Sequence, residues 1–367
     1  MERPASHRGT LSHPERSASP AQLRGTGRTT PVIFLDTTIR DGSNALETGF
    51  LEEDIGPIVS GLVSAGISYI EVGNGVSAGL AGHDRAAKSS DTRAVAIARE
   101  AAPSARLGVL AVPALVALEA LHPLFDFVDF VRLSLAPHEF DLGGPFIQDA
   151  RRRGKQVFIQ LVKSHLIAPE DLAERARPLI GQGADGIYIV DTVGGMMPAE
   201  AALYVGLLHD AFPTPVGFHG HNNTGYAAAN SLAAIDAGAT FVDATVGGIG
   251  RGGGNVQMEL LVALLQKRGE CRDIELERLF ALSLDLWQRY PNVARGIDPL
   301  EVCYAINGLD SLSRDHVRRA AGERGLSPFD VISVLPSHVH GFIATPAEVD
   351  AAADSLERRV EALRTQA

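Results

Sequence analysis

The strongest constraint on the fold of this chain is a repeat of short apolar, β-branched runs, each followed by a longer segment of helical composition. Helical segments are expected at Glu52–Ala65, Thr92–Ala101, Ala114–Leu121, Pro169–Gly181 and Ala199–Ala211. Eight evenly spaced strands in this length predict a (β/α)8 TIM barrel, since an open doubly wound sheet rarely shows that count. The predicted strands are Val32–Asp36, Tyr69–Gly73, Leu107–Val112, Phe127–Leu133, Val157–Val162, Gly186–Asp191, Val216–His221 and Phe241–Val246.

The chain is predicted to have three parts within the α/β class. Residues 1–31 are rich in Arg and Ser and lack the apolar stretch of a secretory signal, so they are expected to form a disordered tail. Residues 32–269 are expected to form the barrel. Residues 270–367 contain segments such as IELERLFALSLDLWQRY and PAEVDAAADSLERRVEALR, which predict a helical C-terminal domain.

The charge balance restricts the kind of partner. The chain has 33 Lys and Arg against 44 Asp and Glu, a net charge of −11 that opposes non-specific binding to nucleic acid or to anionic membranes. Cys271 and Cys303 cannot make a disulfide framework, and no apolar run approaches the roughly 18 residues of a membrane span. These features predict a cytoplasmic protein that acts on small molecules.

Two predicted strand ends carry residues suited to metal chemistry, and barrel enzymes hold their active sites at these ends. Arg40 and Asp41 follow the first strand. His219 and His221 lie at the end of the seventh, and the strand period of two points both imidazoles to one side. With Asp41 they would form a facial set for a divalent ion such as Mn²⁺ or Mg²⁺, although Fe²⁺ also uses such triads. The alternatives are a surface ion pair in an ordinary turn and two histidines that cap a strand.

Two glycine-rich turns lie at the same predicted edge. The run TVGGIGRGGGNVQ follows the eighth strand and contains Asn255; it is interpreted either as a loop that closes the barrel or as a cradle for an anion. The DTVGG turn, Asp191–Gly195, follows the sixth strand. Its backbone N–H groups are expected to be free for a substrate carboxylate.

Three motifs together resemble a known family. DTTIRDG, DTVGGMM and GFHGHNNTGYAAANSLAAIDAGATFVDATVGGIGRGGGN are similar to segments of the DRE-TIM metallolyase superfamily, which includes lyases related to HMG-CoA lyase, and most similar to those of the 4-hydroxy-2-oxovalerate aldolases. The resemblance extends from Val32 to the C-terminal helices. It implies a carbon–carbon lyase that cleaves or forms a 4-hydroxy-2-oxo acid from a 2-oxo acid, pyruvate or 2-oxobutyrate, and an aldehyde, through a metal-stabilised enolate.

The resemblance also implies roles for individual residues. Asp41, His219 and His221 would bind the metal, with Mn²⁺ expected and Mg²⁺ or Co²⁺ as alternatives. Arg40 would bind substrate and stabilise the enolate oxygen. Thr192 would bind substrate as well.

Three further residues are interpreted with less support from the motifs. Glu71, in the second strand, is expected to order Arg40 or the metal ligands, and Asn255 to support them. His165 is interpreted either as part of the pocket wall, where it would contact substrate, or as a buried structural histidine.

The sequence departs from the aldolases at Asn44. Those enzymes have a histidine there that removes the C4 hydroxyl proton, and an asparagine cannot accept a proton near neutral pH. Asn44 is predicted to orient substrate, as the carboxamide at this position does in related lyases and synthases. Another group or metal-bound water would then be the base, unless the protein has other chemistry or none. The candidate groups are His83, His138, His165 and Tyr304, the last of which resembles an active-site tyrosine of the aldolases.

Other functions stay open at this stage. A Claisen-type condensing enzyme or lyase acting on an acyl-CoA would use the same metal site, and Lys163 would allow a Schiff-base aldolase. A non-catalytic subunit of an aldehyde dehydrogenase is a further alternative. The resemblance also implies association with an acylating aldehyde dehydrogenase and a homo- or hetero-oligomeric state.

Overall fold

The computed structural model describes residues 31–73, 75–80, 90–291, 293, 299–339, 341 and 343–366. Its parallel strands close into a barrel in sequence order, because β1 pairs with both β2 and β8. The TIM barrel predicted from the sequence is therefore confirmed. The strands are β1 Ile33–Asp36, β2 Tyr69–Glu71, β3 Arg106–Ala111, β4 Phe130–Leu135, β5 Gln156–Leu161, β6 Gly186–Asp191, β7 Val216–Gly220 and β8 Phe241–Ala244.

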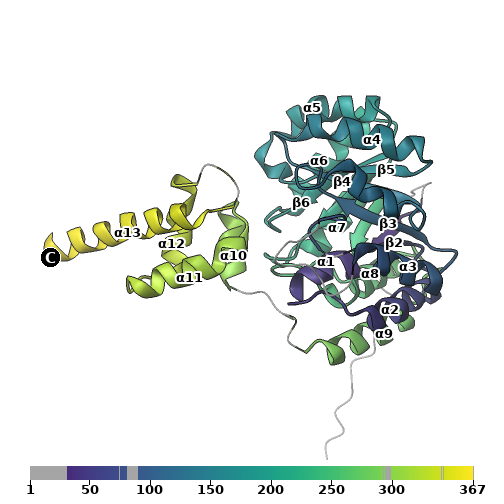
Figure 1. Cartoon of the computed structure of the whole chain (residues 1–367). Helices are drawn as coiled ribbons and strands as arrows, with labels where there is room; N and C mark the ends of the chain where they lie inside the picture. The colour runs from purple at the N-terminus through teal and green to yellow at the C-terminus, as the bar shows by residue number, and fades with distance from the viewer. Residues whose placement is uncertain are drawn as a thin grey trace, which may run out of the picture.

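Helices surround the barrel, and a group of C-terminal helices lies to one side of it (Figure 1). Around the barrel are α1 Thr38–Gly42, α2 Glu52–Ser64, α3 Asp91–Ala101, α4 Gly143–Arg152, α5 Pro169–Gly181, α6 Pro198–Ala211, α7 Ala227–Asp236, α8 Met258–Lys267 and α9 Leu276–Arg289. The C-terminal group consists of α10 Pro299–Ile306, α11 Arg314–Glu323, α12 Pro328–Val334 and α13 Pro346–Gln366.

Two predicted elements differ most from the structure. The helix expected at Ala114–Leu121 is a 3-10 helix, η2, at Leu118–Leu124. Pro123 lies inside it and has no N–H to donate to an α-helical ladder. Strand β4 begins at Phe130 instead of Phe127, because the segment before it forms turns in which Val128 N donates to Leu124 O. The strand also ends two residues later than expected, at Leu135, so Ser134 is part of its C-terminal end.

The lower interior of the barrel is an aromatic layer. Rings from five strands meet there, with the Phe158 and Phe241 centroids 5.3 Å apart. Gly108 and Gly217 point into this layer, where a Cβ atom would overlap the rings of Phe130 and Tyr188 respectively. The glycines thus leave room for the aromatic side chains that fill the barrel. The aromatic layer consists of Tyr69, Phe130, Phe158, Tyr188 and Phe241.

A charged layer lies directly above the aromatic layer. Because side chains alternate along a strand, the residues two positions beyond Tyr69, Phe130 and Phe241 also point inward. These residues are Glu71, Arg132 and Asp243, all buried. The Arg132 guanidinium lies 4.4 Å from the centre of the Tyr188 ring, so the two layers are in contact.

The C-terminal helices have an apolar core of their own, formed by residues of α10 to α13 such as Leu300, Val317, Ile332 and Val349. Helix α9 instead packs on the barrel, where Leu286 joins the main core. The division of the chain at residue 269 stays a prediction. The predicted tail lies outside the described residues, apart from Pro31.

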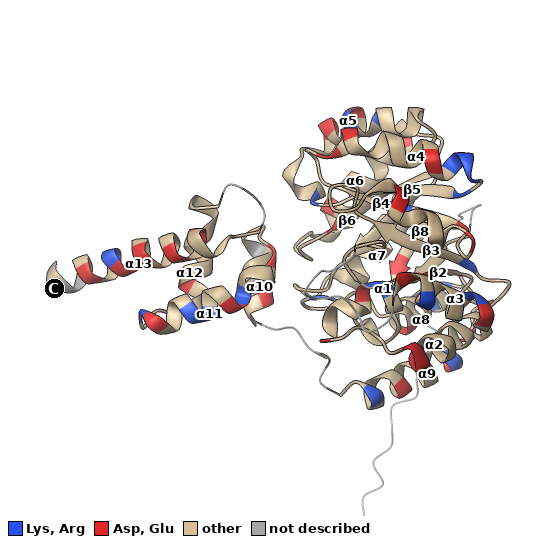
Figure 2. Cartoon of the chain, in the orientation of Figure 1, with Lys and Arg blue, Asp and Glu red and all other residues tan. Residues whose placement is uncertain are grey.

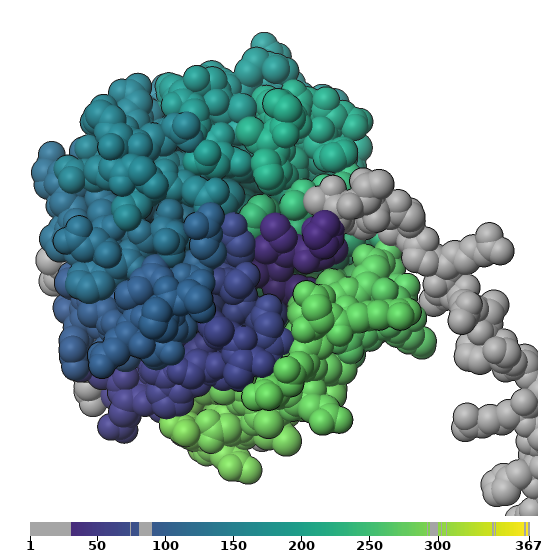
Figure 3. All heavy atoms as spheres, turned by 90° about the vertical axis from the view of Figure 1, so that its right-hand side faces the viewer, coloured from purple at the N-terminus to yellow at the C-terminus, as the bar shows by residue number. Residues whose placement is uncertain are grey.

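The two ends of the barrel differ in what covers them. Helix α10 lies near the C-terminal ends of the strands, where Asn223 Nδ2 donates to Glu301 at 3.1 Å (Figure 1). Figure 3 shows the opposite face, with the purple residues at the start of β1 between the blue and the green parts of the chain. Acidic and basic residues are interspersed along α11 and α13 (Figure 2). No helix among the described residues is long and apolar enough to cross a membrane.

Candidate metal centre and reaction cavity

The turn after β1 holds Arg40 and Asp41 at the mouth of the barrel. Asp36 ends the strand, and its carboxylate accepts hydrogen bonds from Thr38 N at 3.0 Å and Thr38 Oγ1 at 2.6 Å. The same hydroxyl accepts from Val246 N at 2.8 Å, which ties the turn to the loop after β8. Burial raises the pKa of Asp36 to about 7. The turn is thus fixed before any ligand binds.

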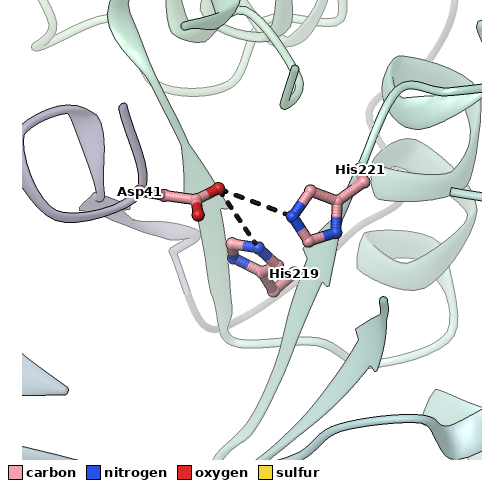
Figure 4. Close-up of side chains that lie close together, drawn as sticks. All are labelled: Asp41, His219 and His221. Carbon is pink, nitrogen blue, oxygen red and sulfur yellow. Dashed lines mark ion pairs between the residues drawn. The ribbon is translucent and has the colours of Figure 1, made fainter. Parts of the chain in front are cut away.

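Strand β7 brings His219 and His221 opposite Asp41, as the sequence predicts (Figure 4). The Nε2 atoms of the two histidines lie 4.0 and 3.5 Å from Asp41 Oδ2, and the possible ligand atoms of all three residues lie within 4.8 Å of one another. His219 Nδ1 bonds Asp243 Oδ2 at 2.7 Å, and His221 Nδ1 bonds the carbonyl of Asp191 at 3.1 Å. Because Nδ1 is used in both rings, Nε2 is left to bind a metal.

The chemistry of this donor set fits a divalent cation. Burial opposes ionisation of Asp41. Arg40 and the two histidines nevertheless hold the pKa of this carboxyl well below its usual range. Burial lowers the pKa of His219, which favours the neutral imidazole that a metal requires. His221 Nε2 and Asn255 Oδ1 are buried and have no hydrogen-bond partner among the described residues. A cation held by Asp41, His219 and His221 would give His221 Nε2 a partner.

Asn255 and Arg40 contact Asp41 from two sides. Asn255 Nδ2 donates to Asp41 Oδ2 at 2.5 Å, and Arg40 Nη1 donates to Asp41 Oδ1 at 2.9 Å. A Cβ atom on Gly250 would overlap the Asn255 amide, so the glycine-rich run after β8 lets Asn255 approach the site. Arg40 Nε also donates to Glu71 Oε1 at 2.5 Å. Glu71 thus contacts Arg40, and Asn255 contacts Asp41, while their supporting roles stay predictions.

The charged layer links Arg40 to His219 without a gap. Glu71 Oε2 lies 3.3 Å from Arg132 Nη1, and Arg132 Nη2 donates to Asp243 Oδ2 at 2.5 Å. That same oxygen bonds His219 Nδ1. Burial opposes a charge on Arg132. The carboxylates of Asp243 and Glu71 nevertheless raise the pKa of this guanidinium. The Arg40 guanidinium and the His219 ring are thus oriented by a single buried chain of ion pairs.

A cavity of about 490 Å³ opens above this site. Its wall includes Arg40, Asp41, His219 and His221, together with the predicted Thr192 and Asn44. Thr192 Oγ1 accepts from Lys163 N at 2.7 Å, and Asn44 Nδ2 donates to Asp41 Oδ1 at 3.0 Å. The remaining wall residues are Gly75, Val76, Leu110, Leu115, Ser134, Gln160, Val162, Val190, Arg251, Leu312 and Ile343.

The three candidate bases among the described residues, Tyr304, His165 and His138, do not line this cavity. Tyr304 is fully buried in the core of the C-terminal helices, where its hydroxyl lies 3.0 Å from Ser313 Oγ and burial raises its pKa to about 12. His165 lies beside Gly308, and burial lowers its pKa. The side chain of His138 is 75% exposed and lies near Glu139. His83 falls outside the described residues.

The expectation of free backbone donors in the DTVGG turn is wrong for Gly194 and Gly195. The Asp191 carboxylate accepts hydrogen bonds from Gly195 N at 3.0 Å and Met196 N at 3.1 Å, and the Asp191 carbonyl accepts from Gly194 N. These N–H groups are therefore not free for a substrate carboxylate. The turn contributes instead through Thr192 in the wall and through the Asp191 carbonyl that orients His221.

Sequence reasoning missed five polar residues of the site. Ser134 and Gln160 follow inward-facing positions of β4 and β5 at intervals of two, a signal that the strand period contains. Arg132 and Asp243 could have been found as charges inside otherwise apolar strands. Arg251, in the glycine-rich run, lines the cavity because its guanidinium bonds the carbonyl of Thr192 at 3.0 Å and pairs with Asp310. That contact crosses from the barrel to the C-terminal region and leaves no local pattern.

Comparison with known proteins identifies the family. An oxaloacetate decarboxylase of Mycobacterium tuberculosis is 43% identical over 319 residues, which cover 87% of this chain and 95% of the relative. The model of the HMGL-like family matches residues 141–285. This chain belongs to the HMGL-like, or DRE-TIM, family. Another relative in this comparison, a 4-hydroxy-2-oxovalerate aldolase of Moorella thermoacetica, is 36% identical and covers 83% of this chain and 90% of its own length.

The family assignment agrees with the fold of solved structures. The N-terminal domain of a putative aldolase from Bacteroides vulgatus superposes with a TM-score of 0.66 at 23% identity, covering 79% of this chain and all of that domain. The carboxyl transferase domain of Rhizobium etli pyruvate carboxylase, solved with pyruvate and biocytin, gives 0.72 at 18% identity, covering 91% of this chain and 62% of that one. Aldolases and decarboxylases both break carbon–carbon bonds. This HMGL-like protein is accordingly a metal-dependent carbon–carbon lyase.

Proposed function

We propose that the protein is an aldolase that cleaves or forms a 4-hydroxy-2-oxo acid, with pyruvate or 2-oxobutyrate as the 2-oxo acid and an aldehyde as the second small molecule. One observation carries the proposal: Asp41, His219, His221 and Arg40 converge on the polar wall of a single cavity. The aldolase relatives, 36% identical or less, support the same substrate class.

The residues of the site divide the chemistry between them. Asp41, His219 and His221 would hold a divalent cation, with Mn²⁺ preferred over Mg²⁺ or Co²⁺, and this cation would supply a Lewis acid. Arg40 donates hydrogen bonds where negative charge develops on the enolate oxygen. During cleavage the C3–C4 bond breaks, its electron pair forms the enolate, and the C4 hydroxyl loses its proton as the aldehyde forms.

The proton of the C4 hydroxyl needs an acceptor other than Asn44. Asn44 lies in the cavity wall, but its amide cannot take a proton near neutral pH. Neither Tyr304 nor His165 is part of this wall. We propose that water in the cavity carries this proton to the solvent, and that Asn44 orients the substrate hydroxyl by hydrogen bonding.

Decarboxylation of oxaloacetate is a second candidate, and Asn44 favours it. Loss of CO₂ also breaks a C3–C4 bond and leaves the enolate of pyruvate, but no hydroxyl proton has to be removed. The relative from M. tuberculosis carries the name of this reaction. Both reactions use the same polar wall. They differ in what occupies the rest of the cavity.

Partners and assembly stay predictions from the family resemblance. The expected macromolecular partner is an acylating aldehyde dehydrogenase that consumes the aldehyde, and the expected assembly is a homo- or hetero-oligomer.

The test uses the purified full chain with Mn²⁺ and three substrates supplied separately: 4-hydroxy-2-oxopentanoate, oxaloacetate and an acyl-CoA with pyruvate. Aldolase function predicts release of pyruvate and acetaldehyde in equal amounts, detected by mass spectrometry, and loss of this activity after chelation. Asp41→Asn serves as the inactive control. Turnover of oxaloacetate alone would replace the proposal with the second candidate, and thiol release would indicate Claisen-type chemistry.

A further inference from the structure

The wall of the cavity changes character between its floor and its rim. The floor is polar and buried, and Asp41 and His219 are each 2% exposed. At the rim, Leu115 is 51% exposed, and Leu312 and Ile343 are each 42% exposed. Three large apolar side chains from separate segments therefore face the same opening. A cluster of exposed apolar side chains at the mouth of a cavity is typical of a site that binds an apolar group.

The size of the cavity exceeds what small reactants need. A volume of about 490 Å³ falls within the range of roughly 300–1,000 Å³ of sites that hold drug-sized molecules. The polar floor accounts for the 2-oxo acid end of a substrate. Neither acetaldehyde nor the carboxylate that oxaloacetate loses carries an extended apolar chain that would cover the three side chains of the rim.

From this we infer that the aldehyde half of the substrate carries an extended apolar group, aliphatic or aromatic, which lies against Leu115, Leu312 and Ile343. The inference rests on the proposed aldolase function and extends it by naming the class of aldehyde. A charged group at the same end would lose part of its hydration against these three apolar side chains.

Contacts between the barrel and the C-terminal region position the rim. Arg251 bonds the Thr192 carbonyl and pairs with Asp310, and the other oxygen of Asp310 accepts from Leu312 N at 2.9 Å. The 3-10 helix η6, Ser311–Ser313, thereby begins at the cavity mouth. The C-terminal region thus supplies Leu312 and Ile343 as residues that select the substrate, while the barrel supplies the chemistry.

The experiment measures kcat/KM for a series of 4-hydroxy-2-oxo acids whose apolar tail grows from methyl to hexyl, with pyruvate release as the readout. We expect about a fourfold rise for each added methylene until the rim is filled, since burial of a methylene contributes about 0.8 kcal/mol. A phenyl-substituted acid should also be preferred over the methyl compound.

Two variants locate the effect. Leu312→Ser and Ile343→Ser should each lower the ratio of kcat/KM between the hexyl and methyl compounds by about tenfold. The matched control is Leu284→Ser on α9, which is 56% exposed and lies outside the cavity wall. This control should keep both the ratio and the activity of the unmodified protein.

The outcomes separate the inference from the function on which it rests. A flat or falling series with active enzyme, or a ratio that neither rim variant changes, would overturn the inference and leave the aldolase function standing. If the enzyme cleaves no member of the series, with or without turnover of oxaloacetate, both the inference and the aldolase function are overturned.

Discussion

The charged layer of the barrel comes from three of the strands that form the aromatic layer, two residues further along each, yet the two layers have different roles. Phe130, Phe158 and their neighbours pack ring against ring and stabilise the barrel. We expect the ion pair of Arg132 with Asp243 to contribute little net stability, because removing two charges from water offsets much of their attraction. What the charged layer provides is orientation, since it fixes Arg40 at one end and His219 at the other. A barrel interior can therefore change from support to chemistry within one strand period.

The largest effect expected from breaking this division is on stability. Phe158→Ala removes a ring that contacts Phe130, Tyr188 and Phe241. We expect the free energy of unfolding to fall by about 3–5 kcal/mol, the usual range for truncating a buried phenylalanine. Denaturant unfolding measures this loss. The affinity of the folded protein for Mn²⁺ should stay within about twofold of the unmodified value, and a large fall in affinity would contradict the separation of the layers.

The next effect concerns Arg40, which lies at one end of the charged layer. Arg40→Lys keeps a positive charge but loses the planar fork that bonds Glu71 and Asp41 together. We expect kcat to fall by about 100-fold, the order found when a donor to a developing oxyanion is removed. Steady-state kinetics with an accepted substrate measure it, and thermal unfolding serves as the control. An unchanged kcat would show that Arg40 is only part of a structural ion pair.

The smallest effect sharpens the comparison within the charged layer itself. Arg132→Lys retains the charge, but an ammonium group cannot bridge Glu71 and Asp243 as the guanidinium does. His219 is then less well oriented, and the dissociation constant for Mn²⁺ should rise about 10- to 100-fold. Calorimetric titration gives this constant. If only the unfolding temperature changes, the layer has a structural role alone.

The strand period revealed more of this molecule from the sequence than the motifs did. Runs such as GIYIVD gave the strand of the structure at its exact ends, Gly186–Asp191, because both faces of that strand are buried. The strand period also predicted that His219 and His221 lie on one side of their strand, because they are two residues apart. Phe127 was assigned to β4 wrongly, because the turn before the strand depends on η2 and not on local composition.

Residues positioned by contacts distant in sequence could not be predicted in this way. Arg251 reaches the cavity through Thr192 and Asp310, which are each 59 residues away. Tyr304 resembles a residue of the aldolase site, but the packing of α10 against the other C-terminal helices buries it. Short motifs carry no information on such packing.

The central claim is that Asp41, His219 and His221 form a divalent-metal site on which activity depends. Its most direct test is Mn²⁺ binding to the metal-stripped protein, measured by calorimetry beside turnover, for the unmodified chain and for Asp41→Asn. The account predicts one Mn²⁺ per chain, activity restored in proportion to the metal bound, and loss of both in the variant while circular dichroism shows an intact fold. Full activity of the stripped protein, or equal Mn²⁺ binding by the variant, would contradict it.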